Sequence, residues 1–119
     1  MQDRRRHPRI EEERRVSLCL VPEHPEPDQH LVMISGVTGD LSGDGLVVKT
    51  YSPLAPGAFL RVDIPLTATS RRRTLSLSGI VRWSRIVPGE NKHLSGIEFF
   101  DIPDPDRQSW SLYVGTLLS

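Results

Sequence analysis

The chain has 119 residues, a length that fits one domain whose core needs neither disulfides nor a structural metal. Apolar residues make up 37% and charged residues 25%, as in a globular protein, and no apolar run approaches the roughly 18 residues of a membrane-spanning helix. The zero net charge argues against a general polyanion binder, and the single cysteine, Cys19, in an apolar stretch suggests a buried thiol in a reducing compartment.

The first ten residues, MQDRRRHPRI, concentrate positive charge at the start of the chain. Thirteen of the fifteen basic residues are arginine, whose planar fork of N–H donors pairs with phosphate or a guanine edge at two points. Three interpretations of this run are open: a solvated tail, ion pairs with the acidic residues at 11–13, or an arm that folds over a phosphate-bearing ligand. Arg5 and Arg9, four apart across the stiff Pro8, have a spacing that lets them reach one ligand from two sides.

Short runs of strand-forming residues follow, separated by turn signals, and an amphipathic segment closes the chain. The runs lie at 16–21, 31–42, 45–50, 59–66, 74–86 and 93–102. From Trp110 onward the apolar residues recur at helical spacing, which predicts a helix at about 105–118 that Asp104 or Asp106 can cap. We therefore expect an all-β fold, a small antiparallel barrel of six to seven strands with one C-terminal helix. Residues 1–15 would be a flexible arm, and 16–119 the barrel with its helix.

The stretch 38–46, with the sequence TGDLSGDGL, is the most specific local feature. Asp40 and Ser42 are two residues apart, so both side chains point to the same side of an extended strand. A carboxylate beside a hydroxyl matches the Watson–Crick edge of guanine, where N1–H and N2–H2 are adjacent donors. Gly43 and Gly45 allow a sharp turn and leave room for a flat ligand. An ordinary hairpin turn is the alternative, because Asp, Ser and Gly are its usual residues.

Together, the two stretches resemble the paired signature of the PilZ domain family. Arg5-x-x-x-Arg9 is followed about thirty residues later by Asp40-x-Ser42-x-x-Gly45. The strand spacing, the GIVRW and GIEFFDI stretches and the closing helix are also similar to that family, over essentially the whole chain. The resemblance implies a bacterial receptor for cyclic di-GMP, built on a six-stranded β-barrel, that is not an enzyme and carries no cofactor or metal.

The resemblance also implies the site. Arginines of the arm would hold phosphates and guanine edges, while the turn would hold a guanine. The implied ligand-contacting residues are Arg4, Arg5, Arg9, Asp40, Ser42, Gly45 and Trp83. A basic residue at Arg4 is similar to members that bind an intercalated dimer of the nucleotide. Trp83 resembles a ring near the ligand in some members, with core packing as the alternative, and Asp44 would lower affinity if its side chain faces the phosphates.

We expect a cytoplasmic, stand-alone receptor that passes its signal to a protein partner. One alternative is a ligand-independent adaptor for motility or pilus assembly, although members of that kind typically lack one of the two motifs. Another is a nucleic-acid-binding barrel, but seven aromatic residues leave few stacking platforms, so no DNA or RNA partner is expected. The sequence has no nucleophile elbow, no Gly-rich nucleotide loop and no paired histidines at zinc-site spacing, which disfavours an enzyme.

Overall fold

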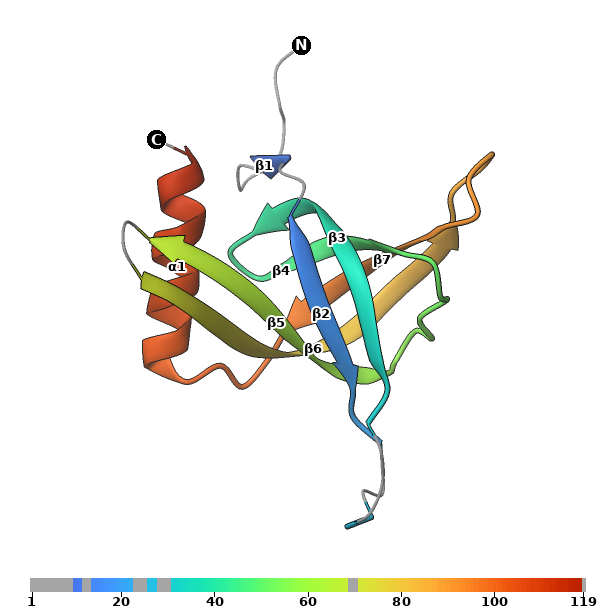
Figure 1. Cartoon of the computed structure of the whole chain (residues 1–119), viewed down its shortest axis with the longest axis horizontal. Coiled ribbons are helices and arrows are strands. Elements are labelled where there is room, and N and C mark those ends of the chain that lie inside the picture. Colours follow the sequence, from blue (N-terminus) through green and yellow to red (C-terminus); the bar gives the residue numbers. More distant parts are fainter. Residues whose placement is uncertain (1–9, 12–13, 23–25, 28–30, 69–70, 119) are drawn as a thin grey trace.

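The computed structural model of the chain describes residues 10–11, 14–22, 26–27, 31–68 and 71–118. In these residues, seven strands precede one helix (Figure 1). The strands are β1 (Ile10–Glu11), β2 (Arg15–Leu20), β3 (Met33–Ser42), β4 (Gly45–Thr50), β5 (Phe59–Ala68), β6 (Arg71–Ile86) and β7 (His93–Phe99), and the helix is α1 (Asp104–Leu118). Each strand and the helix expected from the sequence are present, with ends that differ by a few residues.

Six of the strands close into a barrel. Hydrogen-bonded neighbours follow the order β1-β3-β2-β5-β6-β7-β4, every pair is antiparallel, and β4 also pairs with β3. Strands β2 to β7 therefore form a closed ring, and the short β1 lies outside it along β3. Closure gives each of these six strands a neighbouring strand on both sides, although the far end of the β5–β6 hairpin extends beyond β2 and β7. The predicted fold class, a small antiparallel β-barrel with a C-terminal helix, is confirmed.

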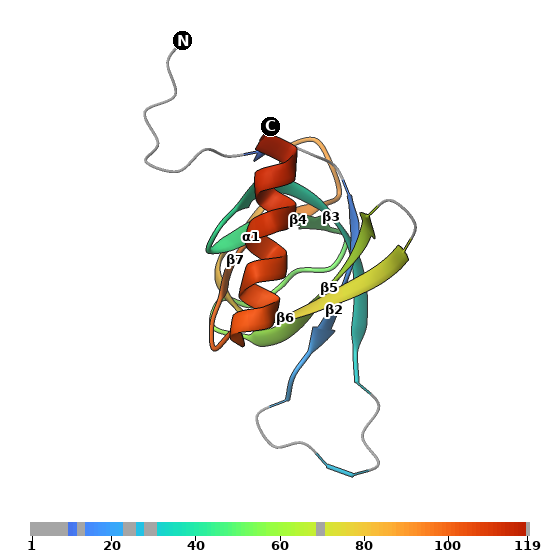
Figure 2. The same cartoon turned by 90° about the vertical axis from the view of Figure 1, so that its left-hand side faces the viewer.

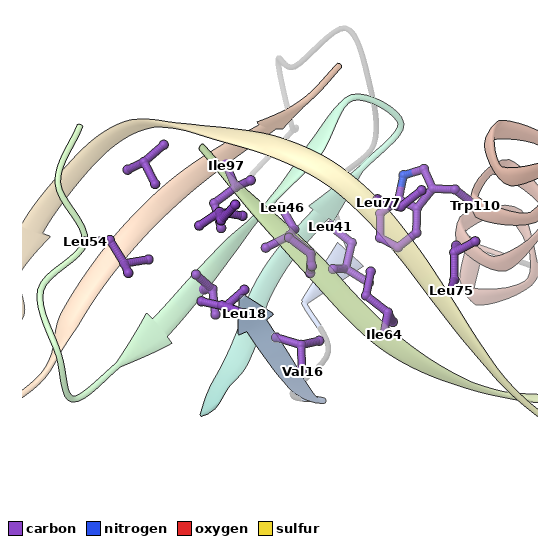
Figure 3. Packing of buried hydrophobic residues seen from close by; sticks show 14 of the residues in the cluster. Val16, Leu18, Leu41, Leu46, Leu54, Ile64, Leu75, Leu77, Ile97 and Trp110 are labelled. Carbon is purple, nitrogen blue, oxygen red and sulfur yellow. The ribbon is translucent and has the colours of Figure 1, made fainter. Parts of the chain in front are cut away.

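The barrel interior is filled by aliphatic side chains that alternate along the strands with outward-facing residues. On β5 the inward residues are Leu60, Val62 and Ile64, and on β6 Leu75 and Leu77 take the same role. Figure 3 shows how side chains from several strands meet in this interior. Cys19 is buried as a free thiol, as its apolar surroundings predicted.

Helix α1 packs against the barrel through one apolar face (Figure 2). Trp110 and Val114, one turn apart, are buried on that face, and Trp110 meets Phe99 of β7 edge-on at 5.2 Å between ring centroids. Asp104 and Asp106 lie in the first turn, where the helix dipole favours negative charge. Among the described residues, no helix is long and apolar enough to cross a membrane.

Candidate ligand-binding site

The turn motif lies at the end of the β3–β4 hairpin, and a β-bulge directs it outward. Leu41 pairs with Leu46 and Ser42 with Gly45, but the register between the strands shifts between Thr38 and Leu41. Thr38 and Leu41 are both buried although they are three residues apart, a separation that places side chains on opposite faces of a regular strand. The extra residue in the bulge resolves this conflict. As a result, Asp40 and Ser42 lie on the outer face, on the same side as each other, as predicted.

Gly45 is required by close packing between strands. A Cβ atom at this position would overlap the backbone carbonyl of Ile97 on β7, which cannot move away as a side chain can. Gly43, by contrast, has open space around it. Among the described residues, left-handed φ angles occur at Gly57, Gly89 and Asp101, so neither turn glycine is needed for its backbone conformation. The structural reason for Gly45 is therefore packing against β7, which the sequence did not predict, and its predicted role of leaving room for a flat ligand stays a prediction.

Trp83 reaches the same face through a second bulge. The register between β6 and β7 shifts between Val81 and Trp83, so Val81 is buried whereas Trp83 is 40% exposed. The indole lies across Gly96 of β7, where a Cβ atom would overlap its ring. Arg85 stacks on the indole, with its Cζ atom 5.7 Å from the ring centroid. Core packing, the alternative considered for Trp83, is therefore wrong.

The four described site residues line one hollow on the outside of the barrel. Asp40, Ser42, Gly45 and Trp83 border a space of ≈ 300 Å³. The remaining lining residues, none of which the motifs pointed to as a contact, are Leu41, Asp44, Leu46, Val47, Arg82, Gly96, Ile97 and Glu98. A glycine inside a strand often marks a place where another group packs closely against the backbone. Gly96 is therefore the one missed lining residue that the sequence could have pointed to.

Carboxylates outnumber cations in this hollow. Its charged lining residues are Asp40, Asp44, Glu98 and Arg82, and Arg82 donates a hydrogen bond to Glu98 at 2.8 Å. Asp44, whose negative charge would lower affinity if it faced the phosphates of the ligand, is exposed and borders the space. The hollow therefore suits the N–H donors of a ligand better than it suits phosphate groups.

A tryptophan of the helix holds the turn in place. The indole N–H of Trp110 donates to the carbonyl oxygen of Ser42 at 2.8 Å, joining α1 to the β3–β4 turn. In Figures 1 and 2 the end of this hairpin lies beside α1. The backbone N–H of Phe99 donates to the carbonyl of Asp44 at 2.8 Å, and the Ser42 hydroxyl donates to the carbonyl of Gly45 at 3.3 Å. Hydrogen bonds from α1, from β7 and within the turn itself therefore hold the turn in this conformation.

The predicted arm is described only where it joins the barrel. Arg4, Arg5 and Arg9 lie outside the described residues. Strand β1 pairs with the site strand, with Ile10 opposite Leu41 and Glu11 opposite Asp40. The backbone that immediately follows Arg9 in the sequence therefore runs alongside Asp40, at the edge of the hollow.

Comparison with known proteins identifies the class. The structure is a small domain made of a six-stranded antiparallel barrel, a C-terminal helix and an outward-facing Asp-x-Ser-x-x-Gly turn. The family model of the PilZ domain matches residues 3–114, and the chain belongs to this family. PilZ domains are typically non-catalytic receptors. No curated protein sequence matches the chain significantly.

Solved structures show the same fold. The inhibitor of motility MotI/DgrA from Bacillus subtilis superposes with a TM-score of 0.68 and 21% identity, over 98% of this chain and 53% of that one. The PilZ domain of CeSA, from a cellulose-synthesising bacterium, gives 0.60 and 19% over 91% and 96% of the two chains. The PilZ domain of YcgR from Escherichia coli, solved with c-di-GMP, gives 0.65 and 13% over 98% and 92%. This chain spans about half the length of the Bacillus protein.

Proposed function

We propose that this protein is a receptor for cyclic di-GMP, which it binds in the hollow beside the β3–β4 turn. The observation that carries the proposal is the convergence of Asp40, Ser42, Gly45 and Trp83 on one outward-facing hollow, although Trp83 comes from a strand distant in sequence. Family membership supports the same ligand, since the YcgR domain of the same fold was solved with it.

Two parts of the chain would bind different groups of the ligand: the hollow would bind a guanine, and the arm would bind the phosphates. The carboxylate of Asp40 and the hydroxyl of Ser42 suit a guanine edge, and Trp83 offers aromatic surface to a base. The ligand also carries two phosphates, which an excess of carboxylates repels. The arginines of the arm, Arg4, Arg5 and Arg9, would supply the missing positive charge and form charge-assisted hydrogen bonds to the phosphates.

The role of the arm follows from this division. Ordering the arm costs conformational entropy that its contacts must offset, so the arm would close only over bound nucleotide. This change in the arm is the signal that a protein partner would read. The protein would then act without catalysing a reaction and would need no cofactor.

Isothermal titration calorimetry with purified protein and cyclic di-GMP tests the proposal. Arg5→Ala, Arg9→Ala and Asp40→Ala should each weaken binding at least about tenfold, as expected for hydrogen bonds to charged groups. Arg61→Ala, which removes an exposed cation from β5 outside the lining of the hollow, should leave affinity unchanged. The melting temperatures of all variants should stay close to that of the parent protein. Absence of binding heat at micromolar nucleotide in low salt would favour the ligand-independent adaptor instead.

A further inference from the structure

A second, larger groove crosses the outer face of β2, β3 and β4, next to the nucleotide hollow. Its volume is ≈ 490 Å³. It is lined by Arg15, Val16, Ser17, Ser35, Gly36, Val37, Lys49, Thr50, Tyr51, Pro65 and Lys92. The charged residues of this lining are three cations and no carboxylate. We call this feature, defined by Arg15, Lys49, Lys92 and Tyr51, the basic groove.

The cations reach the basic groove from three separate segments. Arg15 begins β2, and strand pairing places it opposite Val37, which in turn lies opposite Lys49 of β4. Lys92 comes from the β6–β7 hairpin, and its ammonium lies 5.4 Å from the ring centroid of Tyr51. Tyr51 is 73% exposed. Charge and aromatic surface are therefore presented together to solvent.

Two outward-facing arginines elsewhere on the barrel are paired with carboxylates. Arg61 makes two hydrogen bonds to Asp63, at 3.0 and 3.1 Å, and Arg82 is paired with Glu98. In the basic groove, the one ion pair among described residues joins Lys49 to Glu90 at 3.7 Å, and both side chains are partly exposed. An exposed pair of this length contributes at most about 1 kcal/mol, so an external carboxylate can readily replace Glu90.

We propose that the basic groove docks an acidic segment of a partner protein, one with an apolar or aromatic residue between its carboxylates. The cations would pair with the carboxylates, while Val37, Pro65 and the Tyr51 ring would contact the apolar residue. Three cations form too short a track for a nucleic acid, whose binding depends on many phosphate contacts. The mixed polar and apolar lining instead fits a protein interface, where electrostatic complementarity selects the partner.

The basic groove borders the nucleotide hollow along β4. Val47 lines the hollow and Lys49, two residues further along the strand, lines the basic groove. Arg15, which begins β2, is the last residue of the segment predicted to be the arm. The acidic partner would be the protein to which the proposed receptor signals, and this role rests on the proposed function. The lining and the charges of the basic groove do not depend on nucleotide binding.

Fluorescence anisotropy with a defined probe tests the inference. The probe is a fluorescein-labelled peptide of six glutamates around a central phenylalanine, and a peptide with glutamines in place of the glutamates is the control. Lys49→Ala combined with Lys92→Ala should weaken probe binding about tenfold, as the loss of two exposed ion pairs allows. Glu90→Gln should strengthen it about twofold, because Lys49 then lacks its internal partner. Arg107→Ala should have no effect.

Several outcomes would overturn the inference. Equal binding of the glutamine peptide, or equal weakening by Arg107→Ala, would show that the basic groove does not select the probe. Tripolyphosphate binding that needs Lys49 and Lys92, without probe binding, would assign the groove to a small phosphate ligand. Loss of cyclic di-GMP affinity in the double lysine variant would assign it to the nucleotide site. Nucleotide binding without probe binding refutes this inference alone, and probe binding without nucleotide binding refutes the proposed function alone.

Discussion

Replacing Trp110 by phenylalanine tests whether α1 holds the candidate site in shape. The substitution keeps an aromatic ring against Phe99 but removes the indole N–H that donates to the carbonyl of Ser42 at 2.8 Å. Trp110 is 2% exposed, so water reaches this carbonyl poorly from the helix side. Leaving a buried acceptor unpaired costs about 1–3 kcal/mol. Because Ser42 itself is only partly buried, we expect about 1–2 kcal/mol, a decrease in melting temperature of roughly 5–10 °C.

Urea denaturation followed by far-UV circular dichroism measures this loss, with Gln108→Ala on the exposed side of the same helix as the control. The control should change the free energy of unfolding by about 0.5 kcal/mol or less. Calorimetry on Trp110→Phe should also show a several-fold weaker affinity for cyclic di-GMP, because the turn is less well fixed. If Trp110→Phe loses no more stability than Gln108→Ala, the helix does not hold the turn and this part of the reasoning is wrong.

Three further substitutions probe the hollow directly. Gly96→Ala should displace the indole of Trp83 and weaken nucleotide binding about tenfold in calorimetry. The melting temperature should stay within about 5 °C of that of the parent protein, because the partly exposed indole can move aside. Unchanged affinity would mean that Trp83 is not part of the site. Gly45→Ala should instead lower the free energy of unfolding by about 1–3 kcal/mol, since its Cβ meets backbone on β7, and full stability in denaturation would contradict that packing. Asp44→Asn should tighten nucleotide binding about two- to fivefold at low salt, because it removes a negative charge near the expected phosphates. The gain should be smaller at high salt, where ions screen that charge. Weaker binding would show that Asp44 contacts the ligand favourably.

Local sequence signals were sufficient for the barrel and the helix. Alternating residues such as Leu60, Val62 and Ile64 predicted β5, and the helical spacing from Trp110 predicted the buried face of α1. These elements are defined by short-range periodicity, which tertiary packing did not override. Gly45 was predicted to leave room for a ligand, but its close packing against the backbone of β7 was not predicted, because it depends on a strand distant in the sequence.

The orientation of the site residues could not be predicted from periodicity. Asp40 is two residues after the buried Thr38, and Trp83 is two residues after the buried Val81, so a regular strand would turn both side chains inward. A bulge in each strand reverses this orientation. Where a bulge forms depends on pairing with strands distant in the sequence. The hydrogen bond from Trp110 to Ser42, across 68 residues, was unpredictable for the same reason.

The central claim, that nucleotide binds between the turn and Trp83 beneath the arm, is tested most directly by an NMR titration of uniformly ¹⁵N-labelled protein with cyclic di-GMP. The account predicts shifts of the Trp83 indole signal, assigned with Trp83→Phe, and of the backbone amides at 40–45, together with changes in the amides of residues 4–9. Saturating nucleotide that leaves the Trp83 indole and the 40–45 amides unmoved would contradict it.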